Sequence, residues 1–219
     1  MKLLLMLSES LKSTWTDKVS STVFFKFNID DVSRIRFDTA YFLMSEKRRK
    51  KCDALRREDD KKLCILSDMK TREILSEITG LSYEELEFDT EEAGKPYLKN
   101  ADCHFSISHS EKMVAVAVNK KKPVGIDIEK IRPVSARIAK RVFSLSDIRY
   151  VFQSDNVPDG EILDIEMQER FFRVWTYKEA FVKMTGQGID DDIKNISYNA
   201  ENCVCELSDD YCITVVTKE

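Results

Sequence analysis

The sequence predicts an α+β fold, because segments with the two-residue alternation of strands flank segments with the spacing of helices. The alternation is clearest in His104–Ser110 and Val124–Lys130. Apolar residues at helical spacing run over residues 45–80 and 166–185. Each half of the chain therefore passes from strands to helices and back to strands. With 219 residues, the chain is long enough for one large domain or two small ones.

The composition is that of a globular protein, with 42% hydrophobic and 34% charged residues. The net charge of -4 argues against nonspecific nucleic-acid binding, which requires a basic surplus. Residues 3–7 form an apolar run that is too short to span a membrane and has no signal-peptide cleavage site, so we interpret it as a strand. No CxxC pair occurs and neither histidine is spaced for a zinc site. The even count of six cysteines would allow disulfides, but because the chain is long, Lys-rich and without a signal peptide, we expect a cytoplasmic protein with reduced thiols.

Residues 45–80 predict one amphipathic helix or a helix pair. Ser45 can cap the first turn, and Gly80 suits the end of a helix. The basic cluster at residues 47–51 is denser in one sign than a solvent-exposed helix face requires. An anionic ligand is therefore the alternative to a merely solvated face.

The rest of the chain alternates turns, strands and helices. In order, we expect a turn at residues 94–96, strands at 104–110, 113–118 and 124–130, short helices at 135–143 and 146–152, a long helix at 166–185, and strands at 196–198, 203–207 and 212–216. Gly186 and Gly188 end the long helix. Cys203 and Cys205 are two residues apart and are therefore expected to share one face of their strand.

Four charged residues form the most informative pattern. Asp127 and Glu129 are two apart in a strand, so they point to the same side. Two neighbouring carboxylates repel unless a cation lies between them, and magnesium is the first candidate among hard divalent ions. Glu179 and Lys183 are four apart and share a helix face. If this face meets the strand, three carboxylates and one ammonium converge. The alternatives, solvated acids on an edge strand and an ordinary helix ion pair, explain each pair but not the combination.

These motifs resemble those of the Sfp-type 4′-phosphopantetheinyl transferases. The matching blocks are residues 94–96 followed by 105–110, then 124–130 and 175–183, with the helix at 143–144 between them and the basic helix at 45–52 before them. The resemblance covers residues 45–188, and GIDIE followed by WxxKEAxxK at this spacing is a specific signal. It implies a pseudo-dimer of two similar α+β halves, at residues 1–110 and 111–219, with the active site between them.

The resemblance also implies an enzyme that moves the phosphopantetheine arm of coenzyme A onto a serine of an apo-carrier protein. Adenosine 3′,5′-bisphosphate is released, and catalysis depends on metal and cation stabilisation. By motif match, Asp127, Glu129 and Glu179 bind Mg²⁺. Asp127, Glu179 and Lys183 form the catalytic set. Glu179 accepts the serine proton, and Lys183 contacts the pyrophosphate or protonates the leaving group.

The same match supplies ligands for coenzyme A. Arg48, Lys51 and His109 would hold the 3′-phosphate, which calls for point charges and donors. Ser108 would touch the pyrophosphate, and Lys95 would lie near the adenine and the phosphates. For a histidine in an apolar strand, a packed and hydrogen-bonded core position is the alternative.

This chain departs from the family pattern at two positions. Cys64 stands where many relatives have a threonine near the 3′-phosphate, and only its backbone amide would be a good donor. Asp147 stands in the short helix where relatives have an acidic residue, and the resemblance suggests that it pairs with Lys183.

The implied partners are coenzyme A and an apo acyl or peptidyl carrier protein, with the chain itself a monomer. Our hypothesis, which has no motif behind it, is that basic and apolar residues at 137–152 receive the carrier. The motifs do not indicate whether the carrier serves fatty-acid, polyketide or nonribosomal-peptide synthesis. We expect no nucleic-acid or membrane partner. Two other functions remain open at this point: a magnesium-dependent nucleotide or coenzyme A hydrolase, and a non-catalytic coenzyme A-binding module.

Overall fold

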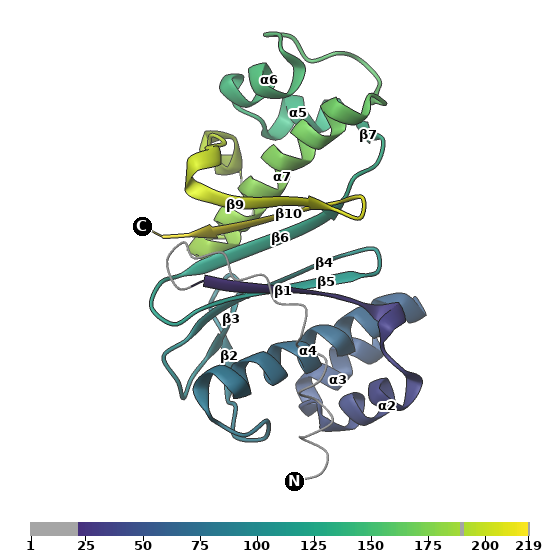
Figure 1. The fold of residues 1–219 in the computed structure, drawn as a ribbon, viewed down its shortest axis with the longest axis vertical. Helices are drawn as coiled ribbons and strands as arrows, with labels where there is room; N and C mark the ends of the chain where they lie inside the picture. The colour runs from purple at the N-terminus through teal and green to yellow at the C-terminus, as the bar shows by residue number, and fades with distance from the viewer. Residues whose placement is uncertain (1–21, 189–190, 219) are drawn as a thin grey trace. The chain divides into compact units, whose positions relative to one another are not determined.

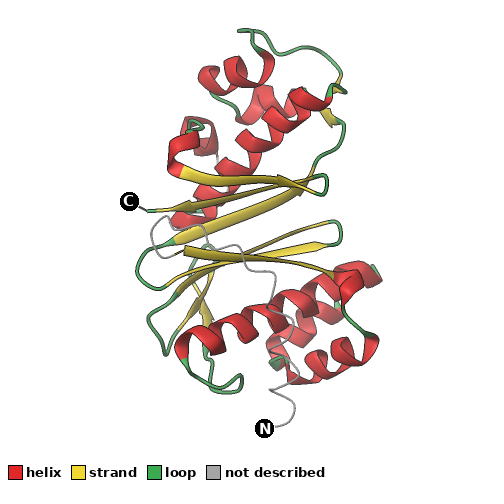
Figure 2. Cartoon of the chain, viewed as in Figure 1, coloured by secondary structure: helices red, strands yellow, loops and turns green. Residues whose placement is uncertain are grey.

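A computed structural model describes residues 22–188 and 191–218. The expected strand at residues 3–7 lies outside these residues. The chain forms two compact units: the described residues up to 89 together with 97–121, and residues 90–96 together with 122 onward. Each unit combines an antiparallel three-stranded sheet with helices (Figure 2), which confirms the α+β class. No helix in the described part of the chain is long and apolar enough to cross a membrane.

The first unit is built around the sheet β1-β5-β4. Its elements are β1 (Thr22–Asn28), the 3-10 turn η2 (Ile29–Asp31), α2 (Arg34–Leu43), α3 (Glu46–Asp53), α4 (Glu58–Thr79), β2 (Phe88–Thr90), β3 (Pro96–Leu98), β4 (His104–Ser110) and β5 (Met113–Asn119). The long helix α4 packs on β5 and β4 (Figure 1). Its apolar stripe, with Leu66 and Leu75 fully buried, forms the core of the unit together with Val114 and Val116 of β5.

The helix signals in this unit act as the sequence predicted. The Ser45 side chain accepts a hydrogen bond from the Arg48 amide and starts α3, while Gly80 adopts a left-handed conformation (φ 79°) and ends α4. Residues 45–80 are therefore a helix pair. The strand β1 and the helix α2 were not predicted.

The second unit is built around the sheet β6-β10-β9. Its elements are β6 (Val124–Lys130), β7 (Val134–Ser135), α5 (Arg137–Val142), α6 (Leu145–Phe152), β8 (Glu161–Ile162), α7 (Ile165–Thr185), the 3-10 turns η3 (Asp191–Asn195) and η4 (Ala200–Asn202), β9 (Cys203–Ser208) and β10 (Tyr211–Thr217). The long helix α7 packs on β6 and β10 (Figure 1). Asp164 caps its start, and Gly186 (φ 72°) ends it as predicted.

Two predictions about this part of the chain are corrected. Residues 196–198 are not a strand, because their backbone bonds to side chains instead of to a neighbouring strand: Ile196 O accepts from Lys178, and Tyr198 N donates to Asp147. The predicted division between residues 110 and 111 falls in the turn that joins β4 to β5. These two strands pair along their whole length, so the compact units divide between residues 121 and 122.

Candidate active site

The acidic residues of β6 lie on the face that α7 covers. Gly125 marks this face, because a Cβ atom added there would collide with the backbone oxygen of Ala180 in α7. Strand alternation then directs Asp127 and Glu129 to the same side. The Lys183 ammonium donates a hydrogen bond to Asp127 Oδ1 at 2.6 Å. The absence of a side chain at residue 125 thus allows the close approach that brings the helix to the acids.

Glu179 lies in the same group of charges and is 9% exposed. Burial raises the pKa of its carboxyl group to about 7, with a further upward contribution from Asp127 and a smaller one from Glu129, while Lys183 acts in the opposite direction. Glu179 thus lies within electrostatic reach of Asp127, Glu129 and Lys183. At neutral pH the Glu179 carboxyl group is able both to accept and to release a proton.

The chemistry of these oxygens fits a hard divalent cation. Three carboxylates in a mostly buried site are costly to ionise together, and a cation would relieve their repulsion. Within residues 22–188 and 191–218, no three or more His, Cys, Asp or Glu side chains are grouped closely enough to hold a metal ion. The donor set is therefore present, but the described side chains are not gathered into a coordination sphere.

A second layer of polar residues holds α7 against β10. Thr214 lies directly opposite Asp127 in the sheet, and its hydroxyl is 2.7 Å from the hydroxyl of Thr176 in α7. Both threonines are fully buried. Sequence reasoning missed this pair, because neither residue carries a motif signal and their contact follows from the pairing of β6 with β10.

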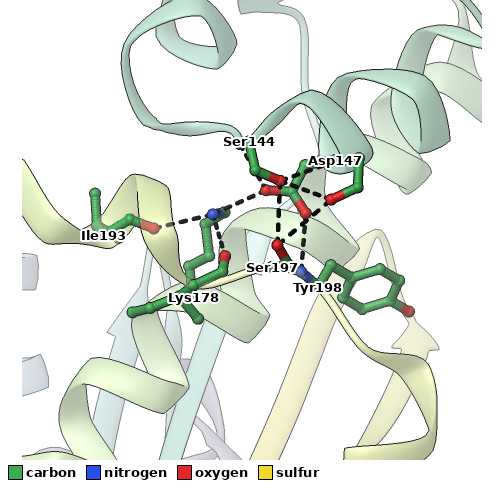
Figure 3. Close-up of polar contacts among 8 residues, drawn as sticks. Ser144, Asp147, Lys178, Ile193, Ser197 and Tyr198 are labelled. Atoms are coloured by element: carbon green, nitrogen blue, oxygen red, sulfur yellow. Dashed lines mark hydrogen bonds and ion pairs between the residues drawn. The ribbon is translucent and has the colours of Figure 1, made fainter.

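Lys178, the residue before Glu179, is fully buried and makes an ion pair with Asp147 at 2.9 Å. Figure 3 shows its ammonium between Asp147 and the carbonyl of Ile193, which accepts a hydrogen bond at 3.0 Å. Asp147 also accepts hydrogen bonds from the backbone amides of Ser144 and Tyr198, both at 2.8 Å. This network joins α6, α7 and the segment before β9.

The suggested pairing of Asp147 with Lys183 is therefore wrong. Asp147 bonds to Lys178 and to the backbone amides of Ser144 and Tyr198, whereas Lys183 bonds to Asp127. The helix explains the difference, because residues 178 and 183 are five positions apart and do not share a face. The Lys178–Asp147 pair was not predicted, although a lysine in the middle of an apolar helix was a signal for it.

Lys95 belongs to the second unit, at the tip of the β2–β3 hairpin. Its ammonium donates a hydrogen bond to the backbone oxygen of Met184 at 3.0 Å, at the end of α7. Burial lowers the pKa of this lysine, and the Glu91 carboxylate partly offsets the effect. Lys95 thus caps the C-terminal end of the helix that carries Glu179 and Lys183.

The other predicted ligands of coenzyme A belong to the first unit. Arg48 and Lys51 lie three residues apart on α3, so they share a face. Lys51 is exposed, and Arg48 Nε is 3.9 Å from Asp68 Oδ1. The same Nε atom is buried and makes no hydrogen bond to any described residue.

Ser108 and His109 are neighbours in β4 and therefore point to opposite faces of the sheet. Ser108 is buried, whereas His109 is exposed, so the core interpretation of the histidine does not hold. Cys64 is buried inside α4, where its backbone amide bonds within the helix. Neither its thiol nor its amide is thus available as the expected donor.

Comparison with known proteins points in the same direction as this geometry. Two family models match the chain: the 4′-phosphopantetheinyl transferase superfamily over residues 123–214, and the 4′-phosphopantetheinyl transferase N-terminal family over residues 31–121. The chain is 33% identical over 155 residues to the 4′-phosphopantetheinyl transferase Sfp of Bacillus subtilis (strain 168), covering 70% of this chain and 65% of that protein.

Two further relatives match this chain over 153 and 124 residues. The 4′-phosphopantetheinyl transferase psf-1 of Bacillus pumilus is 37% identical over 153 residues, covering 69% of this chain and 58% of the relative. The 4′-phosphopantetheinyl transferase HetI of Nostoc sp. is 36% identical over 124 residues, covering 54% and 49%. The chain thus spans between about half and just under two thirds of the length of these relatives.

Proposed function

Because this chain belongs to the Sfp-type 4′-phosphopantetheinyl transferase family, we propose that it transfers the 4′-phosphopantetheine arm of coenzyme A to a serine of an apo-carrier protein. The products are the holo-carrier and adenosine 3′,5′-bisphosphate. The observation that carries this proposal is the convergence of Asp127, Glu179 and Lys183 between β6 and α7. A binding module has no need of buried acids that repel one another.

Asp127, Glu129 and Glu179 would hold Mg²⁺, which when bound supplies positive charge to the pyrophosphate of coenzyme A. Glu179 is the base for the serine hydroxyl. Burial keeps its pKa near neutrality, so the carboxylate can take the proton as the oxygen attacks phosphorus.

Lys183 acts on the opposite side of the reaction. As the phosphorus–oxygen bond to the nucleotide breaks, negative charge develops on the departing phosphate oxygen. The Lys183 ammonium, which in this structure donates a hydrogen bond to Asp127, would stabilise that charge by hydrogen bonding to the departing oxygen. Lys95 and Lys178 position the helix, one at its C-terminal end and one from its buried side.

The first unit would read the nucleotide end of coenzyme A. Arg48, Lys51 and His109 are proposed ligands of the 3′-phosphate, and Ser108 of the pyrophosphate. The buried Arg48 Nε, which is 3.9 Å from Asp68 but makes no hydrogen bond to a described residue, supports this assignment, since a buried donor without a hydrogen bond is costly unless a ligand satisfies it.

The carrier protein is expected to dock on α5 and α6, where exposed apolar residues lie beside basic ones. Leu145 is 51% exposed and Tyr150 is 39% exposed on α6. Arg141 and Lys140 supply positive charge in the last turn of α5. This surface suits an acidic helical partner with an apolar patch.

The proposal is tested by incubating the chain with several apo-carriers, coenzyme A and Mg²⁺, and by measuring intact mass. A carrier that is a substrate gains one phosphopantetheine arm, and adenosine 3′,5′-bisphosphate appears in equal amount. Consumption of coenzyme A at the same rate without any carrier would identify a hydrolase instead. Binding of coenzyme A without any turnover would identify a binding module.

Variants of the acids test the site itself. Asp127→Asn and Glu129→Gln should each lower kcat about 10²- to 10⁴-fold, because each removes charge that the reaction needs. Glu161→Gln makes the same change at an exposed position of β8 and should leave kcat within about twofold. Near-normal turnover of Asp127→Asn would contradict the assignment.

A further inference from the structure

Two thiols of the second unit lie in contact on adjacent strands. Cys205 of β9 and Cys212 of β10 have their sulfur atoms 3.7 Å apart. The two residues are diagonal neighbours in the antiparallel ladder, because Cys205 pairs with Thr214 and Cys212 pairs with Leu207. Cys212 is fully buried, whereas Cys205 keeps partial exposure and is the more accessible residue of the two. Neither thiol has a part in the proposed reaction.

A cation lies beside the more accessible thiol. The Arg173 guanidinium donates from Nη1 to Cys205 Sγ at 3.3 Å. A nearby guanidinium stabilises a thiolate, and it disfavours a bound metal cation at the same sulfur. This arrangement favours a nucleophilic thiolate at Cys205 over a metal site.

The hydrogen-bond pattern assigns the remaining proton to Cys212. The Thr176 hydroxyl donates to Phe172 O at 2.7 Å, so the hydroxyl of Thr214, which lies 2.7 Å away, donates to Thr176. Because the Thr176 hydrogen is already used, Cys212, whose sulfur lies 3.4 Å from the Thr176 hydroxyl, can only donate, so its thiol keeps a hydrogen that lies within reach of both Thr176 and Cys205. The contact with Cys212 and the Arg173 guanidinium both lower the pKa of the Cys205 thiol.

We propose that Cys205 and Cys212 form a peroxide-reactive dithiol, with Cys205 as the attacking thiolate and Cys212 as the resolving thiol. The Cys205 sulfur attacks a hydroperoxide oxygen, the O–O bond breaks, and protonation of the departing oxygen gives water or an alcohol. The resulting sulfenic acid is attacked by the Cys212 sulfur. The S–O bond breaks, the oxygen leaves as water with the Cys212 proton, and a disulfide forms. Two thiols are oxidised and one peroxide is reduced.

Cys203 provides an internal comparison. It lies on the same strand and the same face as Cys205, and it is also partly exposed. Burial raises its pKa to about 12, and its thiol donates to Ala200 O at 3.8 Å. Cys203 is therefore a protonated and unreactive neighbour. Closing the Cys205–Cys212 bridge requires the sulfur atoms to approach from 3.7 Å to roughly 2.0 Å.

The test treats the full chain with equimolar hydrogen peroxide, blocks free thiols with an alkylating reagent, and maps the peptides by mass. We expect loss of two hydrogens and a cross-link between Cys205 and Cys212. The result that overturns the proposal is oxidation that begins at another cysteine, or oxidised Cys205 that never links to Cys212. This measurement does not depend on any variant or on transferase activity.

Variants separate the two thiol roles. In Cys212→Ser, a sulfenic acid on Cys205 should accumulate and be trapped by dimedone. At pH 5, below the pKa of the Cys205 thiol, Arg173→Met should slow the first step about tenfold, because there a rise of about one pKa unit lowers the thiolate fraction by that factor. Cys203→Ser is the matched control and should react like the unchanged chain. Equal rates in Arg173→Met and the unchanged chain would overturn the role of the guanidinium.

Oxidation should also reach the acidic site, a consequence that rests on the proposed function. Cys212 lies directly opposite Glu129 in the sheet and contacts Thr176 of α7. A disulfide from Cys212 to Cys205 of β9 would therefore shift β10 relative to β6 and α7, which carry the acids. Turnover of the disulfide form should fall at least about fivefold and return on reduction. Unchanged turnover would overturn this consequence. If the reduced chain has no transferase activity, the proposed function fails, while peptide mapping still decides the dithiol.

Discussion

In the first unit, the opening strand β1 pairs with β5, which also pairs with β4, and in the second unit β6 pairs with β10, which also pairs with β9. Both units place a long helix between the opening strand and the closing hairpin. Both long helices, α4 and α7, end at a glycine in the left-handed conformation. The shared order allows a position-by-position comparison of the two units.

The opening strands differ at the positions that face the helix. Asp127 and Glu129 are the fourth and sixth residues of β6, whereas Phe25 and Phe27 hold these places in β1. The two phenylalanine rings stack with centroids 6.3 Å apart. One unit thus places partly buried apolar rings where the other places the carboxylates of Asp127 and Glu129.

The long helices agree at one acidic position but differ in its surroundings. Glu73 and Glu179 each lie seven residues before the terminal glycine, and both are buried. Glu73 accepts from Lys70 at 2.8 Å and from Arg36 at 3.3 Å, whereas Glu179 faces other acids. A buried glutamate therefore stabilises the first unit through its cationic partners, whereas in the second unit it is repelled by neighbouring carboxylates. This difference shows that the second unit maintains its acids at a cost in stability, as expected of a functional site.

The largest expected effect separates these two glutamates. Glu73→Gln should lower the free energy of unfolding by about 3–5 kcal/mol, because it leaves the buried Lys70 without its anion. Glu179→Gln should raise it by about 1–3 kcal/mol at pH 8 without Mg²⁺, because it removes a costly charge. Denaturant unfolding measures both. Effects of the same sign would break the comparison.

The sign at Glu179 follows from its pKa, which burial raises from 4.5 to about 7 in the folded chain. The folded state binds this proton more tightly, so its contribution to stability is complete below about pH 4.5 and is lost as the pH rises through about 7. Glu179→Gln should flatten that part of the stability profile.

The second effect concerns the ion pair made by the residue eight positions before each terminal glycine. This residue is Lys178 in α7 and Arg72 in α4. Asp147→Asn should lower the free energy of unfolding by about 3–4 kcal/mol, because it leaves the fully buried ammonium of Lys178 without a carboxylate to pair with. In the first unit, Arg72 holds the same position and pairs with the partly exposed Asp68 at 3.2 Å. Asp68→Asn should therefore cost only about 1 kcal/mol. Equal costs would show that Lys178 is not the special anchor of α7.

The third effect tests how closely each helix approaches its opening strand. Gly125→Ala should cost about 3 kcal/mol and greatly lower turnover, because its Cβ collides with the backbone of α7 and moves Glu179 away from Asp127. Val23 holds the matching position in β1, so that unit already accepts a side chain there. Val23→Ala should cost about 1 kcal/mol. A fully stable and active Gly125→Ala variant would contradict the close approach.

The smallest effect is that of the metal. At pH 8, Mg²⁺ at tenfold excess over its Kd should stabilise the chain by about 1–2 kcal/mol and raise Tm by a few degrees. Hydrogen exchange should slow in β6 and α7 but not in β1 and α4. Asp127→Asn should abolish the shift. A uniform response of both units would mean that Mg²⁺ does not act through the acids of β6.

The sequence by itself determined features that depend on local spacing. Alternation placed Asp127 and Glu129 on one face of a strand, and helical periodicity placed Glu179 and Lys183 on one face of a helix. Ser45 and Gly80 bounded their helices, because capping is a property of a few consecutive residues. These predictions needed no knowledge of how distant elements pair.

Tertiary structure alone decided the contacts between distant elements. The partner of Asp147 is Lys178 instead of Lys183, because the position of α6 beside α7 decides which lysine it meets. The contact of Cys205 with Cys212 requires the register of β9 against β10, in which a shift of one residue would turn one thiol to the other face. Such contacts depend on sheet order and helix placement, which local periodicity does not encode.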